Sequence, residues 1–399
     1  MFIILKKSYH HVSRLLGRIA YHRFGGTKHI LLVAHNALTA EYLAELWELL
    51  HHDQRLKFFQ MIRTPCESPE DQIRAEQLLP MTALTQRVVN YRPWDLVVMA
   101  DHPGPMHILA DLRLHPVLRI PHGISDKRKN GANYFYDARR LRDKEGRLRY
   151  SCIFESSHVS RLTAIRADPS LSDVITVVGN PRLDKIAAST AQRGTLRAAM
   201  GLSPVRPTIL IASSWSANGL FLRIGDALFQ QAQPLLVDFE IVLRPHPHLL
   251  KPDRSGGRNW RAILDHLRTL GFRISTPDQS LTDILAVADV VVSDDISSVA
   301  LYAAAAGKRL VLVRSGSTAV NEDSFNIGEG TFIERLGHVV PTMENAAELR
   351  AALDVALGSW PPLGIEEIQR EINGEPGRST TRIRNAVYRL LKLKEVHSP

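Results

Sequence analysis

Short apolar runs rich in β-branched residues alternate with helical patterns along most of the chain. The first half contains six such runs, each expected to form a strand: residues 29–36, 56–62, 95–101, 117–123, 151–157 and 174–180. The second half contains five more, at residues 208–215, 240–247, 272–276, 288–295 and 308–315. Continuous apolar strands separated by helix-length segments are typical of parallel sheets covered by helices on both faces. The pattern therefore predicts an α/β fold with two doubly wound, Rossmann-like halves.

The segment between the two series of strands marks the expected domain boundary. A helical pattern there ends in Gly201, Pro204 and Pro207, and a new strand begins at Thr208. We place the boundary near residues 185 to 207. The chain is expected to form an N-terminal domain, a C-terminal domain and a helical tail that packs across both, over residues 1–190, 191–360 and 361–399.

Length and composition agree with two globular domains in the cytoplasm. The chain has 399 residues, of which 44% are hydrophobic, enough for two cores. It holds no uninterrupted apolar run of about 18 residues, and Lys6 and Lys7 break the short apolar start, so neither a membrane span nor a secretory signal is expected. The two cysteines, Cys66 and Cys152, lie far apart and are expected to be ordinary reduced thiols.

Basic residues gather at both ends of the chain. The formal net charge is +9 and the isoelectric point is about 9.6, which favours anionic partners. Residues 1–28 contain six basic residues, no acidic one and an apolar stripe at helical spacing, and residues 379–394 repeat this pattern. Each helix either docks on the protein with a solvated charged face or lies on the inner face of the cell membrane. The sequence leaves both alternatives open.

Polar residues recur where the expected strands end. In open parallel sheets, ligands bind beyond the carboxyl ends of the strands, where helix N-termini supply N–H groups. His122 follows one such strand and precedes Gly123, which lets the backbone turn sharply. An imidazole there can act as a general base on an acceptor hydroxyl, although a lone histidine at a strand end is more often an ordinary loop residue.

A second histidine follows a strand of the second half. His246 lies between Pro245 and Pro247, which stiffen the backbone, and Arg244 adds a permanent charge. This combination suits neutralisation of a diphosphate or of the charge that develops on it, and the alternative is a stiff strand exit with an exposed histidine.

The strand at 288–295 leads into Ser297 and Ser298, which begin an Ala-rich helix. Serines at a helix start serve as caps, and the same N-terminus is a natural phosphate seat. The chain contains no Walker-type GxxxxGK[ST] sequence, no GxGxxG in the first half, and no Asp-x-Asp or HExxH spacing. ATPase and dehydrogenase activities are therefore disfavoured, and neither a metal ion nor another cofactor is expected.

Five sequence blocks together carry a family resemblance. They are PHG with a following lysine (His122, Gly123, Lys127), GNPRLD with Arg182, SSW (Ser214, Trp215), RPHP (Arg244 to Pro247) and DISS (Asp295, Ser297, Ser298). In this order and spacing the chain resembles the CDP-glycerol glycerophosphotransferase family, which includes teichoic-acid and capsule polymerases. The blocks span about residues 118 to 310.

The resemblance implies a GT-B fold, with two Rossmann-like domains facing a central cleft. It implies a transferase that moves a phospho-alcohol from a CDP-linked donor to an anionic or lipid-linked polymer acceptor and releases CMP. By the same resemblance His122 is the base and His246 stabilises the diphosphate. The resemblance also implies that Arg244, Ser297 and Ser298 bind phosphate. It leads us to expect a cytoplasmic enzyme that is peripherally associated with the inner face of the cell membrane.

Three other functions stay open. A GT-B glycosyltransferase that uses a nucleotide sugar shares the cleft but breaks a different bond, and it is the main alternative. A sugar-nucleotide 2-epimerase shares the architecture, without a paired-carboxylate motif to favour it. A basic surface protein that binds anionic polymer or nucleic acid without turnover would explain the charge but not the two histidines. Nucleic acid is not an expected partner, because aromatic residues make up only 7% of the chain.

Overall fold

The fold is described from a computed structural model. It describes residues 26–62, 68–100, 115–121, 128–129, 132–133, 136, 138–143, 145–215, 219–251, 255–276, 279–294, 297–314, 337–340, 346–358, 366, 370, 373–374 and 377–394. The chain divides into two compact units. The first comprises Met1–Gly123, Phe135–Gly179 and Arg378–Pro399, and the second comprises Ile124–Tyr134 and Asn180–Gly377.

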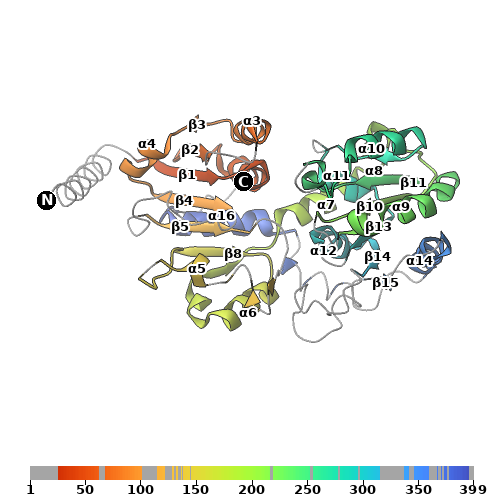
Figure 1. Cartoon of the computed structure of the whole chain (residues 1–399). Helices are drawn as coiled ribbons and strands as arrows, with labels where there is room; N and C mark the ends of the chain where they lie inside the picture. The colour runs from red at the N-terminus through yellow and green to blue at the C-terminus, as the bar shows by residue number, and fades with distance from the viewer. Residues whose placement is uncertain are drawn as a thin grey trace. The chain divides into compact units, whose positions relative to one another are not determined.

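A parallel sheet of seven strands forms the centre of the first unit (Figure 1). In the order in which they pair, the strands are β3 (Thr82–Ala83), β2 (Leu56–Ile62), β1 (Lys28–Ala34), β4 (Leu96–Ala100), β5 (Val117–Ile120), β8 (Cys152–Glu155) and β9 (Ile175–Val177). The chain builds outward from β1 to β3 and then restarts at β4 on the other side of β1. The order of the strands therefore reverses between β1 and β4.

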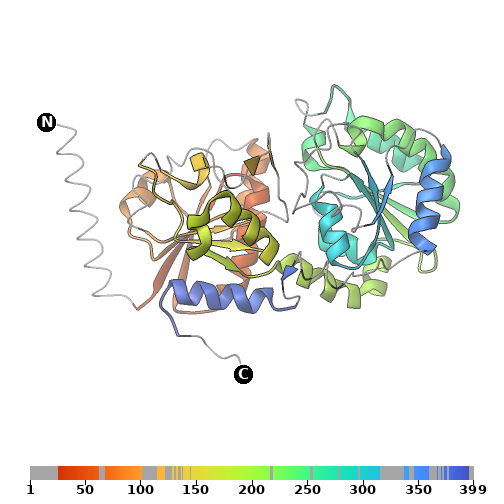
Figure 2. The same ribbon diagram turned by 90° about the horizontal axis from the view of Figure 1, so that it is seen from below.

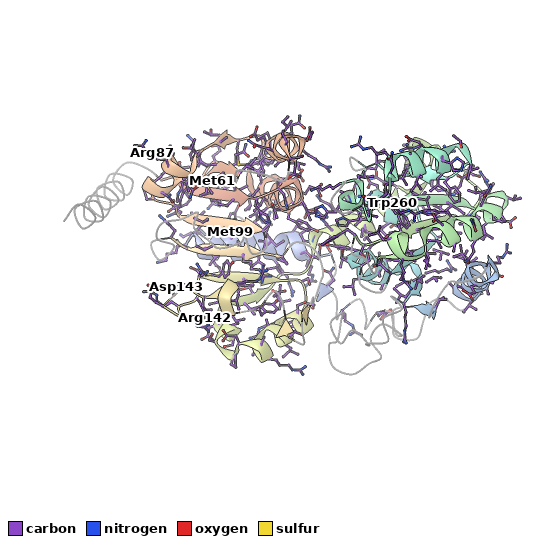
Figure 3. All side chains as sticks on the ribbon, viewed as in Figure 1. Met61, Arg87, Met99, Arg142, Asp143 and Trp260 are labelled. Atoms are coloured by element: carbon purple, nitrogen blue, oxygen red, sulfur yellow. The ribbon has the colours of Figure 1, made fainter. Side chains whose placement is uncertain are left out.

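Helices cover both faces of this sheet, as the apolar strands require. Ile30 and Leu32 point to one face, and Leu31 and Val33 point to the other. The first face carries α2 (Ala37–Leu50), α3 (Pro69–Leu78) and α16 (Ser379–Leu390). The second carries α4 (Gln86–Tyr91), α5 (Ala138–Leu141), α6 (His158–Ala167) and the 3-10 helix η3 (Pro169–Asp173). Met61 and Met99, labelled in Figure 3, are buried on this second face.

The second unit is built on a parallel sheet of six strands. In pairing order they are β12 (Arg273–Ile274), β11 (Glu240–Arg244), β10 (Thr208–Ala212), β13 (Val290–Asp294), β14 (Arg309–Val313) and β15 (His338–Val340). In chain order this is 3-2-1-4-5-6, the Rossmann arrangement, with its switch point between β10 and β13. A separate antiparallel pair joins β6 (Arg128–Lys129) to β7 (Ala132–Asn133).

Two hydrophobic clusters lie on the two faces of this second sheet. One cluster includes α9 (Leu220–Ala232), η4 (Gln233–Val237), η5 (Pro247–Leu250), α10 (Trp260–Thr269) and α14 (Ala346–Gly358). The other includes α7 (Pro181–Ala191), α8 (Arg193–Ala199), α11 (Leu281–Val287) and α12 (Ser298–Ala305). Trp260, labelled in Figure 3, is buried in the first of these clusters and donates its indole N–H to the Ser255 carbonyl.

All eleven strands expected from the sequence are present, so the α/β prediction is confirmed. The strands that the sequence pattern did not indicate are two or three residues long (β3, β6, β7 and β15). The division into units differs from the expected boundaries, because the second unit begins at Asn180. Leu183 and Ile186 of α7 are buried against the second sheet, so this helix belongs to the second unit.

The C-terminal helix α16 is part of the first unit. Figure 2 shows it in blue along the strands of that unit. Ile383, Val387 and Leu391 are buried in the same cluster as α2. The apolar stripe of this helix therefore docks on the protein. The basic segment at residues 1–25 lies outside the described residues, and no helix in the described part of the chain is long and apolar enough to cross a membrane.

A polar clamp holds α16 to the start of β2. The Tyr388 hydroxyl donates to Asp53 Oδ2 at 2.8 Å, and the Arg55 guanidinium donates to the same carboxylate at 2.7 Å. The guanidinium carbon of Arg55 also lies 5.0 Å from the centroid of the Tyr388 ring. The hydrogen bonds from Arg55, opposed in part by burial, lower the pKa of Asp53 from 3.8 to about 2.

This clamp predicts an acid-sensitive attachment of α16. The pKa of Asp53 is lower in the folded chain than in the unfolded one, so its stabilisation is present above about pH 4 and is lost as the pH falls towards 2. We expect Asp53→Asn to reduce the free energy of unfolding of the first unit by about 1 kcal/mol at pH 7, which lowers its thermal midpoint by a few degrees. The thermal midpoint of the variant should also depend less on pH between about 4 and 2. Asp173→Asn, at an exposed carboxylate of the same unit, is the control. An equal pH profile in both variants would contradict the role of the clamp.

Candidate functional site

Four of the residues expected in the site, His122, Gly123, Lys127 and Asp295, lie outside the described residues. The described ones are all in the second unit: Arg182, Ser214, Trp215, Arg244, His246, Ser297 and Ser298. All of these except Arg182 follow or end the neighbouring strands β10, β11 and β13, so the parallel sheet brings them to one edge.

A buried carboxylate organises this edge at the switch point. Asp294 ends β13 and has no exposed surface, and its Oδ2 accepts from the backbone N–H of Ser214 at 2.7 Å and from that of Leu220 at 3.1 Å. Ser213 Oγ accepts from the N–H of Phe221 at 3.0 Å. The first two N–H groups of α9 are thereby satisfied, and a negative charge stands at its positive end. One side chain therefore holds both ends of the loop that carries Trp215.

One ring nitrogen of His246, Nδ1, accepts a defined hydrogen bond. Its Nδ1 accepts from the backbone N–H of His248 at 3.1 Å, so it caps the short helix η5. A backbone N–H can only donate, so Nδ1 carries no proton in this arrangement and the proton of the neutral ring lies on Nε2. His246 is half-buried. The ring is thus set to donate from Nε2, which suits contact with a phosphate oxygen.

Three rings from two strand ends lie together. The Trp215 and His248 rings meet edge to face with centroids 5.5 Å apart, and the His246 and His248 centroids are 5.0 Å apart. Trp215 is 38% exposed, which leaves part of its indole available to a ligand. The structure therefore brings the SSW and RPHP blocks together. His248 was not among the expected site residues, although the second histidine of RPHPH was a visible signal for it.

One nitrogen of the Arg244 guanidinium is held by two hydrogen bonds. Its Nη1 donates to Ser275 Oγ at 2.7 Å and to the carbonyl oxygen of Gln279 at 3.0 Å. These bonds fix the orientation of the planar guanidinium. Part of the guanidinium therefore has a structural task, alongside the expected phosphate contact.

The two serines after β13 differ in their surroundings. Ser297 is buried, and its Oγ accepts from the N–H of Val299 at 3.2 Å, so it is the N-cap of α12. Ser298 is half-buried at the first position of that helix. Across the switch point, the Ser214 hydroxyl has no hydrogen-bond partner among the described residues. A phosphate bound at the N-terminus of α12 would interact favourably with the positive end of the helix dipole, and the Ser214 hydroxyl could donate a hydrogen bond.

Arg182 belongs to a structural junction at the N-terminus of α7, the first helix of the second unit. Its backbone N–H is capped by Asn180 Oδ1 at 3.0 Å, and the Asn180 amide donates to the Tyr302 hydroxyl at 3.2 Å. The Asn180 N–H donates to Asn373 Oδ1 at 2.6 Å, and Asp184 Oδ1 accepts from the N–H of Gly377 at 2.7 Å. The GNPRLD block therefore joins α7 to α12 and to the returning C-terminal chain. Sequence reasoning missed this role of Asn180.

The first unit carries a buried charged group at the corresponding strand ends. Arg119 on β5 pairs with Glu155 at the end of β8 at 3.4 Å, and both side chains are at most 5% exposed. The Tyr136 hydroxyl donates to the same carboxylate. Burial, and then the negative charge of Glu155, raise the pKa of Tyr136. This group fixes the end of β5 through Arg119, two residues before the start of the PHG block at Pro121.

No group of three or more histidine, cysteine, aspartate or glutamate side chains within the described ranges is arranged to hold a metal ion. The described charges at the site are instead those of Arg244, Asp294 and the N-terminus of α12.

Comparison with known proteins finds solved structures of similar fold but no matching sequence family. No protein-family model matches the chain, and no curated protein matches it. The wall teichoic acid polymerase TagF, in a structure soaked with CDPG, has a TM-score of 0.61 at 14% identity, over 97% of this chain and 97% of that chain. UDP-GlcNAc 2-epimerase from Neisseria meningitidis, bound to UDP-GlcNAc, has a TM-score of 0.58 at 15% identity, over 90% of this chain and 100% of that chain. The expected GT-B fold is confirmed, and the structural likeness to TagF agrees with the motif resemblance.

The carboxylate at the switch point generates a stability prediction. Asp294→Ala removes the acceptor for two backbone N–H groups in a buried place, a cost of about 2–4 kcal/mol. We expect the thermal midpoint of the second unit to fall by about 5–10 °C. Asp294→Asn keeps one oxygen in the same place and should cost clearly less. Equal losses in the two variants, measured by differential scanning calorimetry, would show that the bridge does not hold the loop.

Proposed function

We propose that this chain is a transferase that moves a phospho-alcohol, such as glycerol phosphate, from a CDP-linked donor to a cell-surface polymer or lipid-linked acceptor. One observation carries this proposal most strongly. Residues from three sequence blocks, Trp215, His246 and Ser298, follow three neighbouring strands at the switch point of a Rossmann-ordered sheet. The fold resembles that of TagF, which was soaked with CDPG in the structure compared, over nearly the whole of both chains.

The second unit supplies the donor site in this proposal. The exposed part of the Trp215 indole offers a flat surface to the nucleoside, and the N-terminus of α12 with Ser298 receives a phosphate. His246 donates from Nε2 to the phosphate oxygen that becomes the leaving group. These contacts strengthen as negative charge develops on that oxygen, which is the condition for catalysis.

The acceptor side rests on His122, as the motif resemblance implies. The acceptor hydroxyl oxygen attacks the phosphorus that bears the alcohol and forms a new P–O bond, while His122 takes the hydroxyl proton. The bond between that phosphorus and the oxygen of CMP breaks, and CMP leaves with the electron pair. The products are the extended acceptor and CMP. We also propose that the enzyme works peripherally at the inner membrane face, where lipid-linked acceptors are anchored.

A glycosyltransferase that uses a nucleotide sugar is the second candidate. It is favoured by the fold shared with enzymes that bind UDP-GlcNAc, including the enzymes from Neisseria meningitidis and Methanocaldococcus jannaschii. In that reaction the acceptor attacks the anomeric carbon, and a nucleoside diphosphate leaves.

The released nucleotide separates these candidates. We expect purified protein incubated with a panel of CDP- and UDP-linked donors and a lipid-linked acceptor to release CMP from a CDP-linked alcohol. Chromatography of the nucleotides is the measurement. Release of a nucleoside diphosphate from a sugar donor would favour the glycosyltransferase. Conversion of UDP-GlcNAc without an acceptor would favour an epimerase.

The hydrogen-bond pattern of His246 predicts different results for two substitutions. Asn keeps an oxygen near Nδ1 that can cap η5 but removes the donor, whereas Gln places an amide N–H near Nε2 and loses the cap. We expect His246→Asn to fold normally and to lower kcat for CMP release about a hundredfold or more. His246→Gln should retain more activity with a lower thermal midpoint. The reverse order of activities would show that Nε2 is not the functional atom.

The basic character of the site predicts metal-independent turnover. Arg244, His246 and the N-terminus of α12 can neutralise a diphosphate without a divalent ion. We expect turnover to persist after dialysis against EDTA. Loss of activity that magnesium or manganese restores, with a donor that itself needs no ion, would contradict this account.

A further inference from the structure

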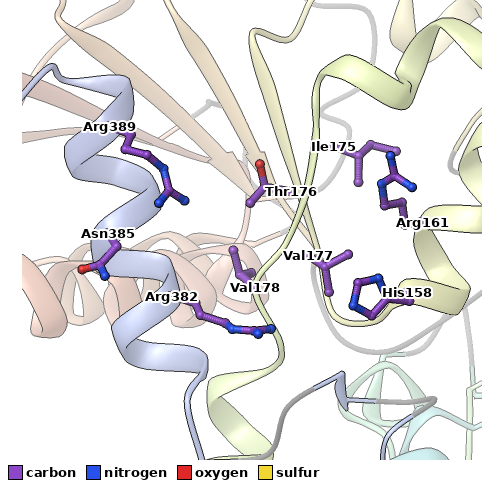
Figure 4. Close-up of a pocket in the computed structure, with 9 residues that line it drawn as sticks. All are labelled: His158, Arg161, Ile175, Thr176, Val177, Val178, Arg382, Asn385 and Arg389. Carbon is purple, nitrogen blue, oxygen red and sulfur yellow. The ribbon is translucent and has the colours of Figure 1, made fainter.

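A basic pocket lies at the edge of the first unit's sheet, formed by β9 between α6 and α16 (Figure 4). Its volume is about 510 Å³, within the range of small-molecule sites. Its described lining residues are His158, Arg161, Ile175, Thr176, Val177, Val178, Arg382, Asn385 and Arg389. None of the donor-site residues described above belongs to it.

The pocket concentrates positive charge. Arg161 and His158 come from α6, and Arg382 and Arg389 come from α16. None of the described lining residues is acidic. Arginine is suited to phosphate because its planar guanidinium can donate two parallel hydrogen bonds. Three arginines around one cavity therefore favour an anionic ligand.

The spacing on α16 favours a ligand with more than one anionic group. Arg382, Asn385 and Arg389 lie three and four residues apart, so they share one face of the helix. Arg382 and Arg389 are separated by two turns, a length of about 10 Å. Figure 4 shows Arg382 and Arg389 extending from the helix toward the strand that bears Thr176, with Asn385 between them along the helix. A ligand with two anionic groups at this spacing would contact both ends of the row at once.

The frame of the pocket is rigid. The opposite face of α16 is buried through Ile383 and Val387, and the clamp at Tyr388 fixes its rotation. On the other side, Arg161 donates to the carbonyl oxygen of Ser172 at 3.4 Å. Among the described strands β9 pairs with β8 alone, so polar backbone groups also line the open edge of the sheet.

We propose that this pocket binds the acceptor as an extended chain of phosphodiester-linked polyols, at a subsite separate from the donor site. This inference rests on the proposed function, because that function supplies an acceptor of this chemistry. The arginines take successive phosphates, and Thr176 and Asn385 take hydroxyl groups between them. The described lining holds no Trp, Tyr or Phe on which nucleic-acid bases could stack. A flat membrane surface does not fit a concave cavity, so a flexible chain is the better ligand.

Binding in the absence of donor tests the subsite. The probe is a fluorescein-labelled poly(glycerol phosphate) oligomer, measured by fluorescence anisotropy with the full chain. We expect Arg161→Gln with Arg389→Gln to weaken binding about tenfold or more. The control, Arg166→Gln with Lys392→Gln, removes the same charge from exposed positions on or next to the same two helices and should change the dissociation constant less than about twofold. Thermal midpoints confirm that both variants fold.

Each alternative has a distinct outcome. Equal weakening in the two double variants would overturn the subsite, because only net charge would then matter. Equal competition by inorganic phosphate or by single-stranded RNA of the same phosphate number would overturn the assignment to a polyol chain. A pocket variant that loses anionic-vesicle binding and keeps oligomer binding would assign the pocket to the membrane instead.

Kinetics separate this inference from the proposed function. If CMP release is observed, the pocket variant should raise KM for a long acceptor while kcat and turnover of a single-unit soluble acceptor stay unchanged. If CMP is not released but the oligomer still binds in a pocket-dependent way, the proposed reaction is wrong and the subsite is supported. CMP release with oligomer binding unaffected by the pocket variant would overturn the subsite and leave the reaction.

Discussion

The carboxylate of Asp294 is the interaction on which the second unit's site depends. It is buried at the point where the strand order reverses, and it accepts hydrogen bonds from both ends of the loop between β10 and α9. A buried charge is tolerated only when hydrogen bonds compensate its desolvation. The loop is held where it can provide those bonds, and Trp215 is positioned as a result. The site geometry thus follows from satisfying one charge, and the parallel sheet decides where that charge lies.

The sheet also explains why residues distant in sequence share one edge. Every strand of the second sheet runs in the same direction, so the segments after β10, β11 and β13 are neighbours. Trp215 and His246 come within contact of the same ring, that of His248. The backbone N–H of His248 fixes the tautomer of His246 as well. His248 is therefore a positioning residue whose effect on the site passes through the ring beside it.

Sequence reasoning could predict the long buried strands, because each is apolar on both faces and is followed by a polar strand end. It could not predict short edge strands such as β15, whose three residues are too few to show a period. It named Asp295 and missed Asp294, although Val290, Val292 and Asp294 alternate onto one face and lead to the N-terminus of α9. The clamp between Asp53 and Tyr388 joins residues 335 positions apart, a pairing that local patterns cannot reveal.

The C-terminal helix shows how one amphipathic pattern can serve two purposes. From the sequence, a basic helix with an apolar stripe fits either a membrane surface or the protein body. In the structure the stripe is buried through Ile383 and Val387, which leaves no apolar face for a bilayer along the described helix. The basic face remains, and two of its arginines line the pocket beside β9. Because the helix period separates these faces, docking of the apolar side is what places Arg382 and Arg389 toward the sheet edge. Two of the basic residues at this end of the chain therefore line a cavity, and this position is what the proposed acceptor subsite rests on.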